Sequence, residues 1–386
     1  MQTAAKLNAF IAYQGPAMNQ KIAIMKKDGK DVINLGLGDP DTIPPEHILK
    51  ALIGAASNPD NHHYPSAYPV RPFYEAIASW YKRQHNVDLD PMTEIIYCLG
   101  AAEGIFQLPN CLLDPGDIAL IPDPAYPSYE AAVKIAGGKV HYYPLIPENN
   151  FLPDLDSIPV RVADMAKMIW VNYPNNPTAA VAGVDFYRKL VGWAQEHNVV
   201  VVSDNPYIDV FLDGCKPPSF LNAPGAKEVG VELCSMSKSF NCCGMRVGML
   251  LGNSQVIGAM AKVKSQSDRG LYHPLQAAAI AALNGPVDWM ERRNEVFAER
   301  RDIVVRAWQQ MGLQMLNPSA TFYCWGTIPN GCTSADFCLK LLDEESVWMI
   351  PGSTYGKNGE GYVRISCAES AGRISEAMER LKRFVS

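Results

Sequence analysis

The sequence predicts an α/β protein whose mostly parallel sheet is covered by helices on both faces. Short apolar runs alternate with stretches of helical periodicity along the middle of the chain, and the runs lie near residues 94–99, 118–121, 168–172 and 199–202. Strands of a parallel sheet have this continuous apolar character because helices cover both of their faces.

The length of the chain predicts more than one domain. At 386 residues it exceeds the size at which a single hydrophobic core stops growing, and 48% of its residues are hydrophobic. We expect a large ligand-binding domain over 46–285 and a smaller α+β domain over 286–386. Residues 1–45 are expected to form an N-terminal arm and part of the smaller domain.

Composition favours a small-molecule ligand. The formal net charge of -6 and the absence of a basic run give no electrostatic surface for nucleic acid. The ten cysteines are scattered without the paired spacings of a zinc site, so we expect no metal and a reducing cytoplasm. The N-terminus lacks the pattern of a signal peptide, and no run of apolar residues is long enough to cross a bilayer, so neither export nor a membrane anchor is expected.

The remaining elements follow from periodicity and from turn residues. Residues 1–30 are polar and weakly helical, and the apolar run 32–37 stops in a glycine-rich turn at Gly36 and Gly38. The glycines of this turn either admit a ligand or only shape the turn. Helices are predicted at 46–56 and 72–85, an alanine-rich helical stretch at 276–283, a long charged helix at 288–311, strands at 321–325, near 347–350 and at 362–366, a helix at 334–344, and a final helix.

Polar or small residues follow each predicted strand of the large domain. The carboxyl ends of parallel strands meet at one edge of a sheet, where ligands gather. Gly100, Ala101 and Ala102 open a helix whose backbone amides suit a phosphate. Asn176 follows one later strand, and Asp204 with Tyr207 follows the next.

The stretch 232–252 carries the strongest chemical signal. Lys238 is flanked by the hydroxyls of Ser235, Ser237 and Ser239, and Arg246 follows eight positions later between two glycines. The serines and the planar guanidinium suit a phosphate dianion. Lys238 would be an amine that captures an aldehyde, with a pKa lowered by burial and by the nearby cation. The alternative is a polar loop between two strands, with Lys238 in solvent.

A pyridine aldehyde phosphate would give each of these groups a task. Asp204 would hold a proton on the ring nitrogen, so that the ring stays cationic and accepts electrons. Asn176 and Tyr207 would donate to the phenolic oxygen of the ring, and Tyr126 would stack on its face. Alternatively, the aspartate and asparagine are ordinary turn residues and the two tyrosines only pack.

Arg364 stands in the middle of the apolar run 362–366. A buried arginine in a strand needs an anion near it. That anion is either a structural carboxylate of the protein or the carboxylate of a ligand, and the sequence leaves both open.

These residues resemble the fold-type I pyridoxal phosphate enzymes, in the class I/II aminotransferase family. The resemblance runs from about residue 30 to the C-terminus, and the stretches 113–117, 151–155 and 217–221 are most similar to the LL-diaminopimelate aminotransferase branch. It rests on Tyr64, Gly100–Ala102, Asp123–Pro127 with Tyr126, Tyr173–Thr178, Asp204 with Tyr207, Ser235–Lys238, Arg246 and Arg364.

The resemblance implies an enzyme that uses pyridoxal 5'-phosphate to move the α-amino group of a free amino acid to a 2-oxo acid. Lys238 would form the internal aldimine and transfer protons, Arg364 would bind the α-carboxylate, and Tyr64 would reach the phosphate of the partner subunit in a homodimer with shared active sites. In full, the implied catalytic residues are Lys238, Asp204 and Tyr207, the cofactor-binding residues are Tyr64, Gly100, Ala101, Ala102, Tyr126, Asn176, Asp204, Tyr207, Ser235, Ser237, Lys238 and Arg246, and the substrate-binding residues are Gly38, Asn176 and Arg364.

The chain departs from this branch at several positions. Pro69 and Ala179 stand where glycine is usual and Tyr74 where arginine is usual, and Cys242, Cys243 and Met245 replace the usual residues after the lysine. We expect these changes to reshape the walls of the pocket. They keep open an oxygen-using oxidase of a basic amino acid such as L-arginine on the same fold. A catalytically idle ligand-binding module is a third hypothesis, against which the intact Lys238 argues.

Overall fold

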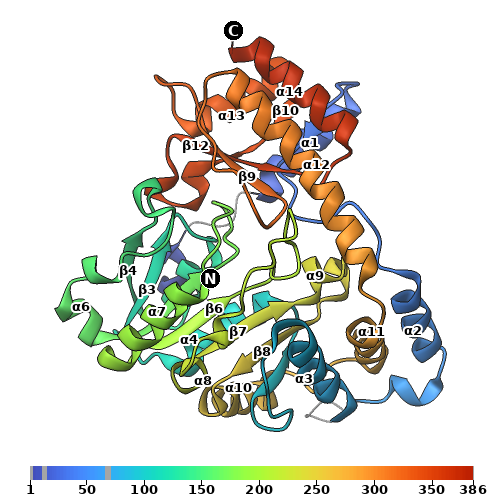
Figure 1. Cartoon of the computed structure of the whole chain (residues 1–386), viewed down its shortest axis with the longest axis vertical. Coiled ribbons are helices and arrows are strands. Elements are labelled where there is room, and N and C mark those ends of the chain that lie inside the picture. Colours follow the sequence, from blue (N-terminus) through green and yellow to red (C-terminus); the bar gives the residue numbers. More distant parts are fainter. Residues whose placement is uncertain (1–2, 11–14, 66–70, 386) are drawn as a thin grey trace.

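A computed structural model describes residues 3–10, 15–65 and 71–385. Within these residues the centre of the molecule is a seven-stranded sheet with the order β2-β8-β7-β6-β5-β3-β4 (Figure 1). Its strands are β2 (Ile95–Cys98), β3 (Ile118–Asp123), β4 (Lys139–Pro144), β5 (Ala166–Asn172), β6 (Val200–Asp204), β7 (Gly230–Ser235) and β8 (Gly248–Gly252).

The sheet is mostly parallel, as the sequence predicts. From β7 through β6, β5 and β3 to β4 neighbouring strands are parallel, whereas β8 runs antiparallel to both β7 and β2. The sequence analysis missed β4, because this strand lies at the edge of the sheet and is partly exposed. A strand of this kind lacks the continuous apolar run of a central strand.

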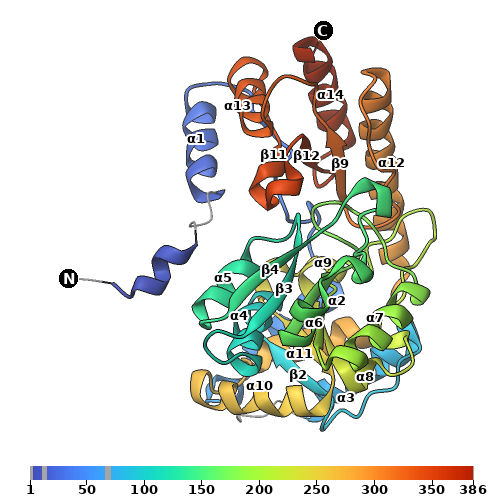
Figure 2. The same ribbon diagram turned by 90° about the vertical axis from the view of Figure 1, so that its left-hand side faces the viewer.

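Helices cover both faces of the sheet. The sheet lies between α4 and α5 on one side and α7 on the other (Figure 2), while α10 packs on α4, and α11 packs on α2 and α3. The helices of this part of the chain are α2 (Glu46–Ala56), α3 (Arg71–His85), α4 (Ala101–Leu112), α5 (Ser128–Ile135), α6 (Val160–Met165), α7 (Val184–His197), α8 (Ala226–Val229), α9 (Met236–Ser239), α10 (Ser254–Ser267) and α11 (His273–Asn284).

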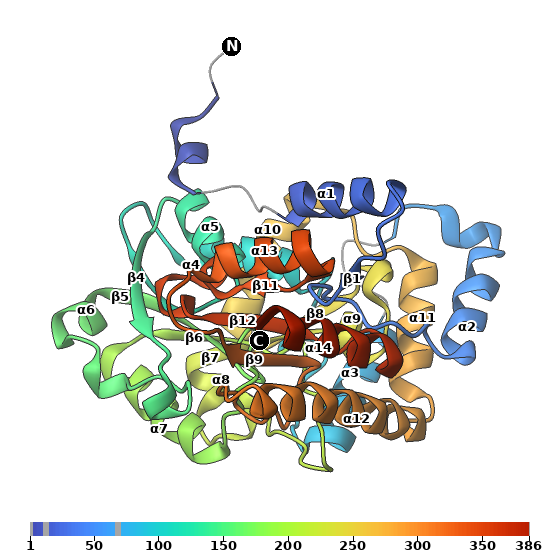
Figure 3. The same cartoon turned by 90° about the horizontal axis from the view of Figure 1, so that it is seen from above.

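A second hydrophobic core lies above the carboxyl ends of the strands (Figure 3). It is built on a three-stranded sheet with the order β11-β12-β9, against which α12 and α13 pack. Its elements are α1 (Gly15–Lys27), β1 (Ile33–Asn34), α12 (Asp288–Gln310), β9 (Tyr323–Thr327), α13 (Ser334–Glu345), β10 (Val347–Trp348), β11 (Ile350–Pro351), β12 (Tyr362–Ser366) and α14 (Ala371–Val385). A large domain with a smaller α+β domain is therefore confirmed, and the expected boundaries at residues 45 and 285 stay a prediction.

The small domain differs from the sequence analysis in one detail. The apolar run 347–350, predicted as one strand, is divided between β10, which pairs with β1, and β11, which pairs with β12. Each strand has two residues, because the chain changes partner between Trp348 and Ile350. Among the described residues, no helix is long and apolar enough to span a membrane.

Hydrogen bonds link the small domain to the segments at the strand ends. The carboxylate of Asp123, the last residue of β3, accepts bonds from Asn358 N and Nδ2 at 3.1 and 3.0 Å. Ala125 N donates to Tyr355 O at 2.7 Å, and Thr321 N donates to Val210 O at 2.7 Å. The loops that follow β3 and β6 are therefore held against the small domain, which closes over the carboxyl edge of the sheet.

Two of the positions that depart from the usual residues of the branch can be described in the fold. One lies in the core away from the carboxyl edge of the sheet, and the other has a strained backbone. Tyr74 belongs to the core between α3 and β2, where its hydroxyl accepts a hydrogen bond from Tyr97 N at 3.4 Å. Ala179 is 2% exposed and adopts a left-handed conformation with φ of 60°. Pro69 lies outside the described residues.

Replacing Ala179 with glycine should stabilise the protein. A side chain in the left-handed region costs roughly 1–2 kcal/mol, of which the greater freedom of glycine in the unfolded chain offsets about half, so the net gain should be about 1 kcal/mol. Urea unfolding followed by fluorescence measures it. Ala180→Gly is the matched control, since Ala180 is equally buried and does not have positive φ, and it should destabilise the protein by about 0.5–1 kcal/mol. A loss of stability in both variants would contradict the expectation for Ala179.

Candidate active site

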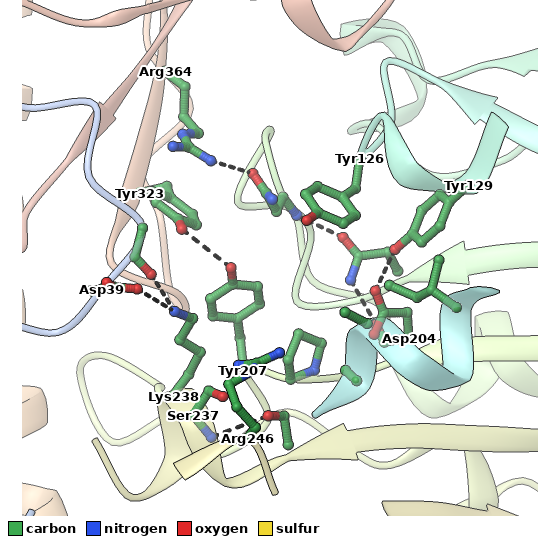
Figure 4. A pocket seen from close by; sticks show the side chains of 18 of the residues that line it. Asp39, Tyr126, Tyr129, Asp204, Tyr207, Ser237, Lys238, Arg246, Tyr323 and Arg364 are labelled. Carbon is green, nitrogen blue, oxygen red and sulfur yellow. Dashed lines mark hydrogen bonds and ion pairs between the residues drawn. The ribbon is translucent and has the colours of Figure 1, made fainter. Parts of the chain in front are cut away.

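A cavity of about 340 Å³ lies between the carboxyl edge of the large sheet and the small domain (Figure 4). Strand ends of the large domain supply one wall, and Tyr323 and Arg364 of the small domain supply the other. Of the residues predicted from sequence, the cavity is lined by Gly38, Ala101, Ala102, Tyr126, Asn176, Asp204, Tyr207, Ser235, Ser237, Lys238, Arg246 and Arg364.

The expected reshaping of the cavity walls stays a prediction, and one of these departures touches a residue of the cavity, since Cys243 Sγ lies 3.2 Å from Lys238 Nζ. Tyr74, Ala179, Cys242, Cys243 and Met245 are not among the residues that line the cavity. Cys242 is buried in the core, and Met245 packs against the same core. Tyr74 belongs to that core as well.

Lys238 lies on the short helix α9, which begins where β7 ends. Ser235 caps this helix by accepting a hydrogen bond from Ser237 N at 3.1 Å. Lys238 Nζ donates to Gly38 O, lies 3.3 Å from Asp39 Oδ1, and lies 3.2 Å from Cys243 Sγ. The lysine is therefore held in the cavity and is not the solvated loop residue of the alternative interpretation.

The lowered pKa expected for Lys238 is wrong for the cofactor-free chain. Burial lowers the pKa of Lys238. The acidic groups of Tyr323, Cys243 and Asp39 raise it by more, so that the net shift is upward. The sequence placed a cation near Lys238 and gave no sign that Asp39 and Tyr323, from distant parts of the chain, lie beside it.

Arg246 and the start of α4 form a cradle at one end of the cavity. Gly100 has φ of 74°, and a side chain there would place its Cβ 2.4 Å from Arg246 Nη2. Gly248 is equally constrained, since its Cβ would lie 2.8 Å from Ala101 N. Ala101 and Ala102 at the helix start line the same cavity as Arg246, and backbone amides together with an arginine suit a phosphate.

Asp204 is buried at the end of β6. Tyr129 donates a hydrogen bond of 2.5 Å to its Oδ2, whereas Oδ1 has no hydrogen-bond partner among the described residues. Burial raises the pKa of Asp204 to about 7, although the bond from Tyr129 lowers it. A buried carboxylate oxygen beside a cavity is suited to a cationic N–H donor of a ligand.

Sequence analysis missed two residues around Asp204. Tyr129 lies three positions after Tyr126, and Asn172, the last residue of β5, pairs with Asp204 in the sheet and donates to its carbonyl at 2.6 Å. Asn172 could have been found, because it ends a predicted strand at the same edge as Asp204. No sequence signal distinguishes Tyr129 from an ordinary core tyrosine.

Arg364 lies on β12 at the opposite end of the cavity. Its Nη1 donates to Asn176 Oδ1 at 2.9 Å, and its Nη2 donates to Gly36 O at 3.0 Å. The guanidinium lies 4.0 Å from the centre of the Tyr323 ring, whose hydroxyl is 3.2 Å from that of Tyr207. These partners orient the guanidinium at the wall of the cavity, and its planar fork suits the carboxylate of a ligand.

Comparison with known proteins assigns this arrangement to a family. The family model described as aminotransferase class I and II matches residues 30–381. The chain belongs to this family. Class I and II aminotransferases use pyridoxal phosphate, and this chain is a pyridoxal phosphate-dependent aminotransferase. Nothing in these comparisons supports the oxidase alternative.

Individual relatives of this aminotransferase cover nearly its whole length. An LL-diaminopimelate aminotransferase from Moorella thermoacetica is 44% identical over 385 residues, 100% of this chain and 99% of the relative. One from Aquifex aeolicus is 47% identical over 92% of each chain. Among solved structures, the substrate-bound BacF from Bacillus subtilis superposes with a TM-score of 0.96 at 37% identity, covering 100% of this chain and 98% of that one.

The residues present fit pyridoxal phosphate. Asp204 Oδ1, which has no hydrogen-bond partner among the described residues, suits the protonated ring nitrogen. The helix start at Ala101 and Ala102, together with Arg246, suits the phosphate. Lys238 lines the same cavity and carries the amine that an aldehyde requires. Two residues predicted for the cofactor do not line this cavity: Gly100, which lies behind Arg246, and Tyr64, whose side chain is 87% exposed.

The raised pKa of Asp204 predicts how the stability of the cofactor-free chain depends on pH. The folded chain binds this proton with a pKa of about 7, against 3.8 for an ordinary aspartate. Between these values the unfolded chain has lost the proton that the folded chain keeps. The free energy of unfolding should therefore fall as pH rises from about 4 to about 7, by up to roughly 4 kcal/mol, and this contribution should level off above pH 7.

Asp204→Asn should remove this dependence, so that the cofactor-free variant gains stability over wild type as pH rises through about 5 to 8. Urea midpoints of the two cofactor-free proteins across that range measure the difference. Asp156→Asn, at an exposed position, is the control and should follow wild type. Parallel curves for wild type and Asp204→Asn would contradict a raised pKa at Asp204.

Proposed function

We propose that this aminotransferase takes its amino group from LL-diaminopimelate, with Arg364 and Lys238 acting on the two groups at the α-carbon. The observation that carries the proposal is that one cavity is lined by both a guanidinium and a lysine amine, with the carboxylate of Asp204 between the same walls. An α-amino acid offers a carboxylate to the first and an α-proton to the second.

The chain's own residues divide the work between binding and proton transfer. When bound, pyridoxal phosphate supplies an aldehyde that condenses with amines and a cationic ring that withdraws electrons from the substrate α-carbon. Arg246 and the amides of Ala101 and Ala102 would hold the phosphate, assisted by the hydroxyls at the start of α9. Tyr126 would lie on the ring face, and Asp204 Oδ1 would accept the ring N–H.

Lys238 and Arg364 would act on the substrate. Arg364 binds the α-carboxylate through the planar fork of its guanidinium, which Asn176 and the Gly36 carbonyl keep in place. Lys238 Nζ would take the proton from the substrate α-carbon as general base, and would then act as general acid toward the carbon that carried the cofactor's aldehyde. Tyr207 would orient the phenolic oxygen of the cofactor through its buried hydroxyl.

Two observations support a diamino acid as donor. The relatives named above as LL-diaminopimelate aminotransferases match 92–100% of the chain at 44–47% identity. In addition, Asp39 lines the cavity with a side chain that is 75% exposed. Once the cofactor holds Lys238, this carboxylate is available to a cation, and the distal ammonium of a diamino acid supplies one.

A spectral screen tests the proposal. LL-diaminopimelate should change the visible absorption of the bound cofactor without oxygen, and 2-oxoglutarate should restore it, whereas phenylalanine and aspartate should act at least about 10-fold more weakly in kcat/KM. Arg364→Lys keeps the charge but loses the fork, and it should raise KM for the donor at unchanged cofactor content. A faster response to an amino acid without a distal ammonium would overturn the proposed donor.

We also propose that the protein is a cytoplasmic homodimer with shared active sites. Tyr64 and Ile43 are large side chains that are 87% and 79% exposed, and Tyr272, near the former, is 39% exposed. Tyr272 contacts His62, two residues before Tyr64, and exposed apolar side chains that gather on a surface favour a protein interface. In a dimer of this kind Tyr64 would reach the phosphate of the partner subunit.

Mixed dimers separate a shared site from a local one. Tyr64→Ala and Lys238→Ala chains should each be impaired at limiting cofactor, and refolding them together should restore roughly a quarter of wild-type activity through hybrids with one intact site. Each variant refolded alone is the control. If Tyr64 served its own chain, every site in the hybrid would lack one residue, and no activity would return.

A further inference from the structure

Arg293 is a buried arginine that contacts the backbone of Lys238 from another part of the fold. It lies near the start of α12, and 7% of its surface is exposed. Its Nη1 donates to Lys238 O at 2.9 Å and to Ser239 O at 2.6 Å. Its Nη2 donates to Asp209 O at 2.7 Å.

The contacts have a clear physical basis. The carbonyls of Lys238 and Ser239 stand at the end of α9, where a helix leaves carbonyl groups without partners inside the helix. A cation there satisfies these carbonyls and interacts favourably with the helix dipole. The fork of the guanidinium allows one side chain to serve two segments at fixed angles, which the flexible ammonium of lysine does not.

Burial of this charge has to be offset by hydrogen bonds. Burial lowers the pKa of Arg293 to about 10 although the carboxylate of Asp209 raises it. Asn294 Oδ1 accepts from both Nε and Nη2, at 3.2 and 3.0 Å, and the Trp289 ring centre lies 5.2 Å from the guanidinium carbon. Groups of α12 and the backbone carbonyls described above therefore hold the guanidinium in place.

The two segments joined by Arg293 carry two residues of the cavity. One is α9 with Lys238, and the other is the stretch after β6, where Tyr207 lies two residues before Asp209. The helix that supplies the arginine continues into the small-domain core through Val304 and Trp308. Arg293 is thus the point at which α12 meets the backbone of the lysine.

We propose that Arg293 is a positioning residue for transamination: it fixes the backbone at Lys238 so that Nζ stays in line with the substrate α-carbon. The inference rests on the proposed role of Lys238 as the proton-transfer group. It does not require Arg293 to touch substrate or cofactor. Without the guanidinium, α9 loses the group that holds its C-terminal carbonyls, and Nζ loses its fixed place beside Gly38 O and Asp39.

Arg293→Met and Arg293→Lys test the proposal, with Arg292→Met as the matched control. Arg292 is on the same turn of α12 but is exposed and pairs with Asp288 at 2.8 Å. Arg293→Met should lower kcat about 100-fold with KM for the donor nearly unchanged, since a displacement of about 1 Å suffices for such a loss. Arg293→Lys should fall between, and Arg292→Met should match wild type.

A readout on the cofactor-free protein separates positioning from loss of the fold. Acylation of lysines at fixed pH, followed by peptide mass mapping, should show Lys238 labelled severalfold faster in Arg293→Met, relative to the exposed Lys50, because Nζ is no longer held. Other lysines should keep their wild-type rates. Unchanged labelling of Lys238, or faster labelling of all buried lysines together with a lower thermal midpoint in both Arg293 variants, would overturn the proposal.

The same measurements keep this proposal apart from the proposed function. If Lys238→Ala retains full activity, the function assigned to Lys238 is wrong. The labelling of Lys238 in the Arg293 variants then still reports whether Arg293 holds that lysine.

Discussion

Asp204 places a buried carboxylate oxygen, which has no hydrogen-bond partner among the described residues, at the wall of the cavity, and this constraint shapes the active site. An unpaired buried oxygen is unfavourable by itself, and the protein meets it with a raised pKa and a single bond from Tyr129. The arrangement becomes favourable when a cationic N–H donor enters the cavity. The large domain therefore favours a ligand that carries a cationic N–H group at the end that faces Asp204.

The other end of the cavity follows from the small domain. Arg364 and Tyr323 come from adjacent strands, β12 and β9, and the loops after β3 and β6 are bonded to the same domain. Neither domain alone holds both a place for the cofactor and a place for a carboxylate. The reaction therefore depends on how the two domains are held together, and α12 is the longest element that both of them share.

Much of the fold and of the cavity could be predicted from the sequence, because the signals for these features lie in neighbouring residues. Neighbouring residues alone identified the apolar strands predicted at 118–121 and 168–172, the turn after each of them, and the lysine among serines. The pKa of Lys238 was predicted with the wrong sign because Asp39 and Tyr323 are distant in the chain. Tyr129 and Arg293 were missed for the same reason, since a tyrosine in a helix and an arginine in a charged helix are ordinary until their partners are known. The edge strand β4 was missed because partial exposure removes its apolar pattern.

Gly100 divides the site into a part that can change and a part that cannot. At Gly100, with φ of 74°, an added methyl group would strain the backbone and displace the guanidinium of Arg246, so a substitution there is unfavourable. Asp39, in contrast, lines the same cavity from an exposed loop, where a substitution meets solvent. In an enzyme built in this way, substrate specificity can change during evolution through single substitutions at the cavity entrance, while the residues that hold the cofactor stay the same.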